Sequence, residues 1–385
     1  MKSLTRRPSS SLFSTSHRTL PSSTLPPRLY QCLHSTAPKP ADPLPITTLA
    51  PPPSAPLPAA SQYGERVDRR RRQAELLKRG QDLRASNMKP GSAVTKRFWK
   101  DVTVQTAEES SAGPNHHTIH LDKRPVRNPA TKTLLHIPPS KPHLATAIAL
   151  EWDLLVSAQQ ALKQHLIPLT SIASRAEDLA LADQAAASTP QMSRTRAEMV
   201  NMLMRYLDTD TLLCWAPARP SHASDALEAR SAGPSLRDLQ IRTALPIIAY
   251  LVTHVWPGVE IRPVLDDGSI VPASQPDGTR EVIRGWISGL KAWELAGLER
   301  AVLAGKSLCV GVRLLVEWSE EFAGLRAWVG RGARFGIEEA AEACSLEVRW
   351  QTRLYGEVED THDVEREDVR RQLGSVVLVV SGTGG

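Results

Sequence analysis

Two acidic segments hold the side chains of this sequence that could do acid–base chemistry. The first runs from Leu207 to Thr211 and contains Asp208 and Asp210, whose carboxylates are two positions apart and could flank a water molecule. A catalytic site would need a histidine or lysine partner, which the segment lacks. Aspartate and threonine directly after a helical pattern are also favoured caps. We therefore prefer a structural cap to a hydrolase that uses Asp208 and Asp210.

The second acidic segment lies near the end of the chain and contains Glu357, Glu359 and Asp363. A calcium-binding loop would need a glycine at its midpoint and a glutamate at its last position, and neither is in register here. Two interpretations stay open for this segment. It is either a solvated face of a helix or a charged surface on which a partner docks.

Histidines and cysteines are the other possible metal ligands. His116, His117 and His120 are close in sequence, but neighbouring residues on a strand point to opposite faces, and no carboxylate or cysteine completes the set. The cysteines, at positions 32, 214, 309 and 344, are far apart, which argues against a disulfide framework and favours a reducing compartment. Motifs for a phosphate-binding loop, a serine nucleophile and a zinc protease are absent. We expect no metal and no cofactor.

The distribution of charge separates the start of the chain from its body. The 385 residues carry 47 Lys+Arg and 41 Asp+Glu. Residues 1–41 hold 6 basic side chains and no acidic one, residues 42–91 hold 9 basic and 5 acidic, and residues 92–385 hold 32 basic and 36 acidic. A folded body that covered nucleic-acid phosphates would usually be basic itself. We therefore expect no nucleic-acid partner for the body.

The first part of the chain has the composition of a targeting and linker region. Residues 1–41 are rich in Ser, Thr and Arg, which predicts a mitochondrial presequence. Residues 42–91 predict a disordered linker that is first proline-rich and then basic. The basic segment 66–84 could form a helix, which we interpret as solvated. The alternative is a mitochondrial RNA- or ribosome-associated factor that uses this segment.

The remaining sequence predicts an α+β fold. Residues 92–140 predict a small β-rich N-terminal domain with an antiparallel sheet, with strands near 98–104, 118–121 and 133–137. Residues 141–385 predict a larger, mainly α-helical domain, because apolar residues recur at helical spacing. Within it we expect a helix capped by Thr279, a short strand near 259–264, a loop over 324–336 and a C-terminal strand over 376–380. The longest apolar stretch, 244–256, is too short to span a bilayer.

Tryptophan is frequent in this chain, with nine residues. Trp152 and Trp293 fall on the apolar stripes of predicted helices, so we expect buried indoles there. Tryptophan is also a common anchor of protein interfaces, and both residues are therefore candidates for binding another protein or for supporting the fold.

Several strings, in order, resemble one family. The strings at 97–104, 120–127, 149–153, 205–211, 293–299 and 355–359 are similar to the mitochondrial F1-ATPase assembly chaperones that act on the ATP synthase α subunit. The resemblance covers about residues 96–380. This chain departs from the family pattern at Ala244 and Leu245, where the family usually has Trp-Asp, at Tyr355, where a Trp is common, and at Asp360, which replaces an aromatic residue.

The resemblance implies a function. It implies a monomeric protein of the mitochondrial matrix that is not an enzyme. It would bind the newly imported α subunit, shield its subunit interface from aggregation and hand it to the β subunit. The residues that we expect to bind the client or to support the fold are Trp152, Asp208, Asp210, Trp293, Glu357, Glu359 and Asp363.

Overall fold

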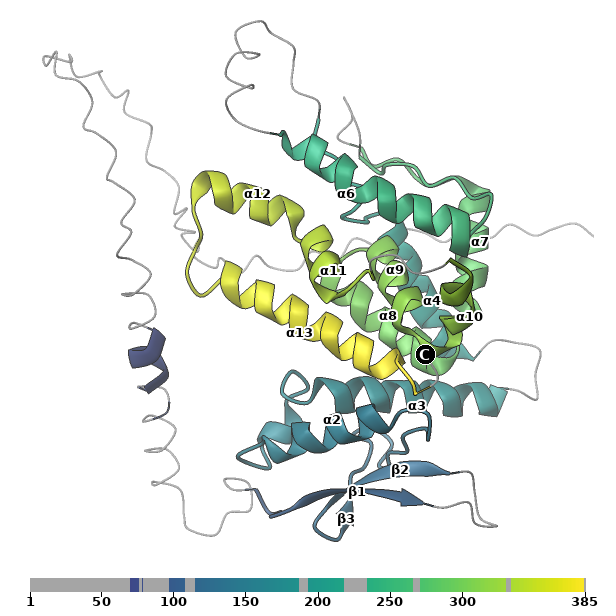
Figure 1. The fold of residues 1–385 in the computed structure, drawn as a ribbon. Coiled ribbons are helices and arrows are strands. Elements are labelled where there is room, and N and C mark those ends of the chain that lie inside the picture. Colours follow the sequence, from purple (N-terminus) through teal and green to yellow (C-terminus); the bar gives the residue numbers. More distant parts are fainter. Residues whose placement is uncertain are drawn as a thin grey trace, which may run out of the picture. The chain divides into compact units, whose positions relative to one another are not determined.

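The architecture comes from a computed structural model, which describes residues 70–75, 78, 97–107, 115–186, 193–217, 234–265, 271–329 and 334–383 (Figure 1). The chain divides into two units, Met1–Arg72 and Gln73–Gly385. The predicted presequence and most of the predicted linker lie outside the described residues. Residues 70–75 and 78, inside the basic segment, are helical.

A three-stranded antiparallel sheet opens the second unit. Strand β1 (Val102–Ala107) pairs with β2 (His116–Leu121), and β2 pairs with β3 (Arg124–Pro125), in the order β1-β2-β3. The turn between β2 and β3 contains Asp122 at φ 55°, in the left-handed region that aspartate tolerates. Its carboxylate accepts hydrogen bonds from the backbone N–H groups of Lys100 and Asp101 at 3.0 and 2.9 Å, which joins the turn to the start of β1.

Helix α2 (Pro142–Asp153) packs against β1 and β2. The apolar residues buried in this part come from β2, from one stripe of α2 and from the segments next to the strands. They include Trp99, Ile119, Leu121, Val126, Leu135, Ile137, Leu144 and Ile148. The small sheet and α2 therefore share one core.

The described residues that follow α2 are mainly helical and pack around α9 (Leu308–Trp318), whose residues from Leu308 to Glu317 are all buried. Helix α8 (Ala292–Gly305) packs against α9, α3 (Pro168–Ala186) and α13 (His362–Val380). The other helices are α4 (Arg194–Leu207), α6 (Leu236–Tyr250), α7 (Asp277–Ser288), α10 (Ala323–Val329), α11 (Ile337–Cys344) and α12 (Leu346–Tyr355). The described residues also form two short turns of 3₁₀-helix, η1 (Gln160–Leu162) and η3 (Glu320–Phe322), and a π-helix, η2 (Leu251–Val255). The predicted α+β fold class is confirmed.

Two predicted strands in the helical part are wrong. Residues 376–380 are the last turns of α13, where Val376, Val379 and Val380 are buried. Packing of these β-branched side chains against other helices outweighs their strand preference. Near 259–264 the chain is irregular and makes one isolated bridge, between Cys214 and Leu265.

Three further local predictions need correction. The predicted strand over 133–137 makes only the isolated bridges Arg127–Leu134 and His117–Ile137. Helix α7 begins at Asp277, and Thr279 lies inside it, where its hydroxyl donates to the carbonyl of Glu260 at 2.8 Å. The predicted loop over 324–336 begins as α10. Within the described part of the chain, no helix is long and apolar enough to cross a membrane.

Candidate functional site

Asp210 joins two distant parts of the chain. It lies just after α4, and its carboxylate accepts hydrogen bonds from the backbone N–H groups of Leu212 at 2.9 Å and of Cys309 at 2.8 Å. Cys309 is in the first turn of α9, where backbone N–H groups have no partner within the helix. Asp210 is fully buried, and this burial raises the pKa of its carboxyl. The residue acts as a helix cap inside the core.

Asp208 has a different partner. Its half-buried carboxylate pairs with the guanidinium of Arg280 in α7. Asp208 and Asp210 therefore each bind a separate element, α7 and α9, which matches the structural interpretation of this acidic segment rather than a shared hydrolytic site.

Trp152 belongs to a polar network at the end of α2. It is half-buried rather than buried, and its indole N–H donates to the hydroxyl of Thr170 at 3.0 Å. The same hydroxyl donates to Glu151 at 2.7 Å, and Glu151 accepts the backbone N–H of Leu169 at 2.8 Å. Burial raises the pKa of Glu151. This network joins α2 to the first turn of α3. Trp152 therefore helps to hold these two helices together.

Trp293, also half-buried, lies beside a buried lysine. The ammonium group of Lys141 is 5.9 Å from the ring centre of Trp293, and it pairs with Glu320 at 2.7 Å. It also donates to the carbonyls of Val380 and Ser381 at 3.1 and 3.2 Å. These contacts connect the start of α2 to the C-terminal end of α13, where a positive charge is favoured.

The acidic segment 357–363 covers most of the turn between α12 and α13 and the first two residues of α13, which begins at His362. The interpretation of this segment as a helix face is therefore wrong for Glu357 and Glu359. Glu357 pairs with Arg366 at 2.6 Å. Glu359 and Asp363 are both half-buried.

Large apolar side chains are exposed on both sides of this turn. We call residues 354–364 the tip. Tyr355 is 82% exposed, and Leu354, Val358 and Val364 are each more than half exposed. In Figure 1 the tip lies where α12 meets α13, at the end of α13 that is farther from the sheet. Exposed apolar side chains grouped in this way, next to acidic ones, are typical of a surface that binds another protein.

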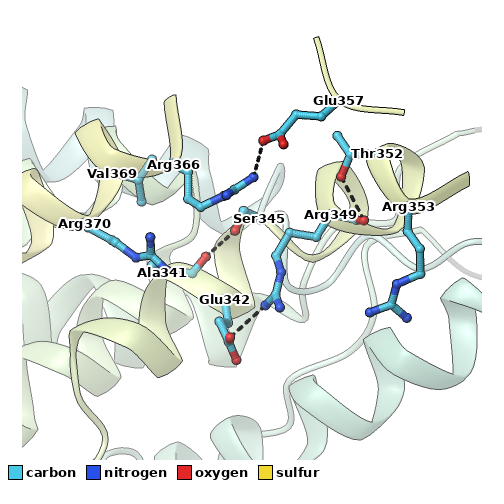
Figure 2. A pocket seen from close by; sticks show the side chains of 10 residues that line it. All are labelled: Ala341, Glu342, Ser345, Arg349, Thr352, Arg353, Glu357, Arg366, Val369 and Arg370. Carbon is cyan, nitrogen blue, oxygen red and sulfur yellow. Dashed lines mark hydrogen bonds and ion pairs between the residues drawn. The ribbon is translucent and has the colours of Figure 1, made fainter. Parts of the chain in front are cut away.

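A cavity of about 340 Å³ lies between α12 and α13 beside the tip. We call it the arginine groove, because Arg349 and Arg353 line it from α12 and Arg366 and Arg370 line it from α13. Figure 2 shows Arg349 and Arg366 pointing into it from opposite sides. Glu342 pairs with Arg349 at 2.9 Å, and Glu357 pairs with Arg366.

A second exposed apolar cluster lies far from the tip in the sequence. It runs from the end of α2 to η1 and contains Leu150, Leu154, Val156 and Leu162, the last of which is 81% exposed. Two acidic residues lie within its range, Glu151, which accepts the backbone N–H of Leu169, and Asp153, which pairs with Arg97 at 3.2 Å.

The described residues can be searched for side chains that would hold a metal ion together. Among them, no group of three or more His, Cys, Asp or Glu side chains is placed to hold a metal ion. Burial raises the pKa of the thiols of Cys214, Cys309 and Cys344. Raised thiol pKa values make these cysteines poor nucleophiles.

Sequence reasoning missed the arginine groove and the buried Lys141. A signal for the groove was present, because Arg349 and Arg353 are four positions apart, as are Arg366 and Arg370. Residues with that spacing share one face of a helix. No local pattern indicated that the two faces meet.

Comparison with known proteins gives consistent matches. A family model described as ATP12 chaperone protein matches residues 96–252. The mitochondrial protein atp12 of Schizosaccharomyces pombe is 30% identical over 287 residues, which cover 74% of this chain and 81% of that protein. The mitochondrial protein ATP12 of Saccharomyces cerevisiae is 29% identical over 296 residues, which cover 74% of this chain and 84% of that protein.

The fold also matches a solved structure. The crystal structure of the Atu1473 protein of Agrobacterium tumefaciens superposes with a TM-score of 0.50 at 21% identity, and the match covers 77% of this chain and 92% of that one. At this identity the likeness concerns the fold alone.

Proposed function

The chain belongs to the ATP12 family of chaperones, and on that premise we propose that it binds the unassembled α subunit of the mitochondrial F1-ATPase. It shields the surface through which α contacts β, prevents aggregation of α, and hands α to the β subunit during assembly. A subunit of an obligate ring exposes a large apolar interface until it meets its partner. Exposed apolar area of that extent favours aggregation, so the interface needs a temporary cover.

We propose the tip as the surface that holds the client. Leu354, Tyr355 and Val358 are large apolar side chains in contact with solvent, and burying them against the client is favourable. Glu359 lies in the turn and Asp363 in the first turn of α13, and both favour a client surface that is basic around its apolar centre. An exposed apolar tip with acidic neighbours, on a member of a chaperone family, is the observation that carries the proposal.

Release is part of this function, because the chaperone must leave when the β subunit arrives. The tip offers only a few apolar side chains, whereas an obligate interface buries a much larger area. A small contact gives moderate affinity, and charged contacts at its rim affect the association rate more than the final affinity. The larger interface with β can then displace the chaperone.

We propose that the protein acts as a monomer in the mitochondrial matrix, after the predicted presequence has been removed. The relatives from both yeasts carry names that place them in mitochondria. We further propose that it works by binding alone, without catalysis, a cofactor or nucleic acid. Trp152, Asp208, Asp210 and Trp293 then support the fold that presents the tip.

Co-purification tests the proposal. The protein is imported into mitochondria with an affinity tag, recovered from the matrix, and its partners are identified. We expect unassembled α subunit to be recovered with it. Recovery of only the β subunit, or of RNA, would overturn the proposal.

A matched pair of variants tests the position of the surface. Leu354→Ser with Tyr355→Ser alters the tip, and Leu154→Ser with Val156→Ser alters the other exposed apolar cluster. All four side chains are more than half exposed, so circular dichroism should show that both variants fold. We expect the tip variant alone to lose the α subunit. Equal recovery with both variants would exclude the tip.

A further inference from the structure

We infer that the arginine groove binds an acidic, extended segment of the client subunit while the tip holds the apolar surface. This inference rests on the proposed function and adds a second, chemically distinct contact to it.

The charge of the groove is opposite to that of the surrounding body. Four arginines and two glutamates line it, whereas residues 92–385 as a whole carry more acidic than basic side chains. The guanidinium groups come from both walls, α12 and α13, and do not converge on one point (Figure 2). The apolar side chains of Ala341 and Val369 also line the cavity. Guanidinium groups spread along two walls, with apolar side chains among them, fit a peptide with several carboxylates better than a single phosphate.

The existing ion pairs in the groove can be exchanged. Arg349 pairs with Glu342, Arg366 pairs with Glu357, and Arg370 pairs with Glu338 and Glu367, with all of these side chains between 31% and 71% exposed. Ion pairs this exposed contribute about 0–1 kcal/mol each, so carboxylates of a client can replace Glu342 and Glu357 at little cost. Arg353 is exposed and forms no ion pair with any described residue, and it is available from the start.

One wall of the groove can adjust to a bound segment. None of the residues of α12, all of which the structure describes, is buried, in contrast to the buried α9. Ser345, which precedes α12, is outside helical geometry, and Gly356, which follows it, has φ 91°. Cavities of about 180 and 420 Å³ lie on the side of α12 that faces α6. A helix held this loosely can shift to admit a chain, as an adaptable binding surface requires.

A peptide-binding measurement tests the inference. The probe is a fluorescein-labelled peptide that alternates glutamate with glycine and leucine, and a glutamine version of it is the uncharged control. Fluorescence anisotropy is recorded with the full chain and with two variants, Arg353→Glu and Arg262→Glu. Arg262 is a matched control because it is also exposed but does not line the groove.

We expect the glutamate peptide to bind, the glutamine peptide not to bind, and Arg353→Glu to weaken binding by about tenfold or more. Arg262→Glu should leave binding unchanged. Equal weakening by both variants, or no preference for glutamate, would overturn the inference.

A competition experiment with purified α subunit separates this inference from the proposed function. Displacement of the glutamate peptide by α supports both. Binding of α without displacement of the peptide overturns the assignment of the groove to the client and leaves the proposed function intact. Failure of α to bind at all overturns the proposed function, and with it the assignment of the acidic segment to that client.

Discussion

The carboxylate of Asp210 accepts a hydrogen bond of 2.8 Å from the backbone N–H of Cys309, a residue 99 positions further along the chain. Asparagine at position 210 would keep one acceptor but place an amide N–H₂ against a backbone donor. We expect Asp210→Asn to lower the free energy of unfolding by about 1–3 kcal/mol, the usual effect of a buried donor without a partner. Urea denaturation measures this change.

The neighbouring Asp208 is the control for that experiment. Its ion pair with Arg280 is about one-third exposed, and such pairs contribute less than about 1 kcal/mol. We therefore expect Asp208→Asn to have the smaller effect. If the two variants were equally destabilised, the loss of stability in Asp210→Asn could not be attributed to the cap on α9.

The pH dependence of stability should depend on Asp183. Burial alone would raise the pKa of this carboxyl, but hydrogen bonds from Arg196 and Ser193 outweigh it and hold the pKa below its ordinary value of 3.8. Because the folded pKa is the lower one, the carboxylate stabilises the fold above about pH 4, and this contribution is lost as the pH falls through the folded pKa.

Asp183→Asn tests this dependence. It should lower stability at neutral pH and make the urea midpoint less sensitive to pH below about pH 4. Arg196 also donates to the carbonyls of Ser288 and Leu290, so it stays anchored in the variant. An unchanged slope of stability against pH would show that Asp183 does not titrate in this range.

Gly297, in α8, lies against the side chain of Val380 in α13. A Cβ atom at this position would lie 2.6 Å from Cγ1 of Val380, which is closer than real side chains approach. We expect Gly297→Ala to destabilise the fold by about 1–3 kcal/mol through overpacking. Thermal denaturation measures the change.

Gly285, in α7, is the matched control for that change. A Cβ atom there meets nothing within 4 Å, so Gly285→Ala should stabilise the fold by about 0.5–1 kcal/mol through helix propensity. The same sign of change at both positions would contradict the packing of α8 on α13.

The predictions from sequence succeeded where the spacing of apolar residues followed one period over many neighbouring positions. Helical spacing identified the body as helical, and strands near 98–104 and 118–121 correspond to β1 and β2. They failed at residues 376–380, because the burial of Val376 and Val380 against other helices cannot be read from a five-residue window. The division into domains at 92–140 and 141–385 stays a prediction.

Candidate residues could be proposed from sequence, but their partners could not. Asp210 was interpreted as a cap, yet the capped helix α9 begins about a hundred positions later. The sequence singles out the acidic segment that carries Glu357 and Glu359, but it does not predict a turn there. That turn and the exposure of Tyr355 depend on how α12 and α13 lie in three dimensions. Contacts between distant segments are fixed by packing of the whole chain, which local patterns do not encode.

The central claim is that this protein covers the α subunit until β arrives, and a light-scattering measurement tests it most directly. Denatured α subunit is diluted into buffer with an equimolar amount of the protein, and purified β subunit is added later. We expect suppressed scattering, followed by release of the free chaperone and formation of an α–β complex. Scattering equal to that of α alone, or a chaperone that stays bound after β is added, would contradict it.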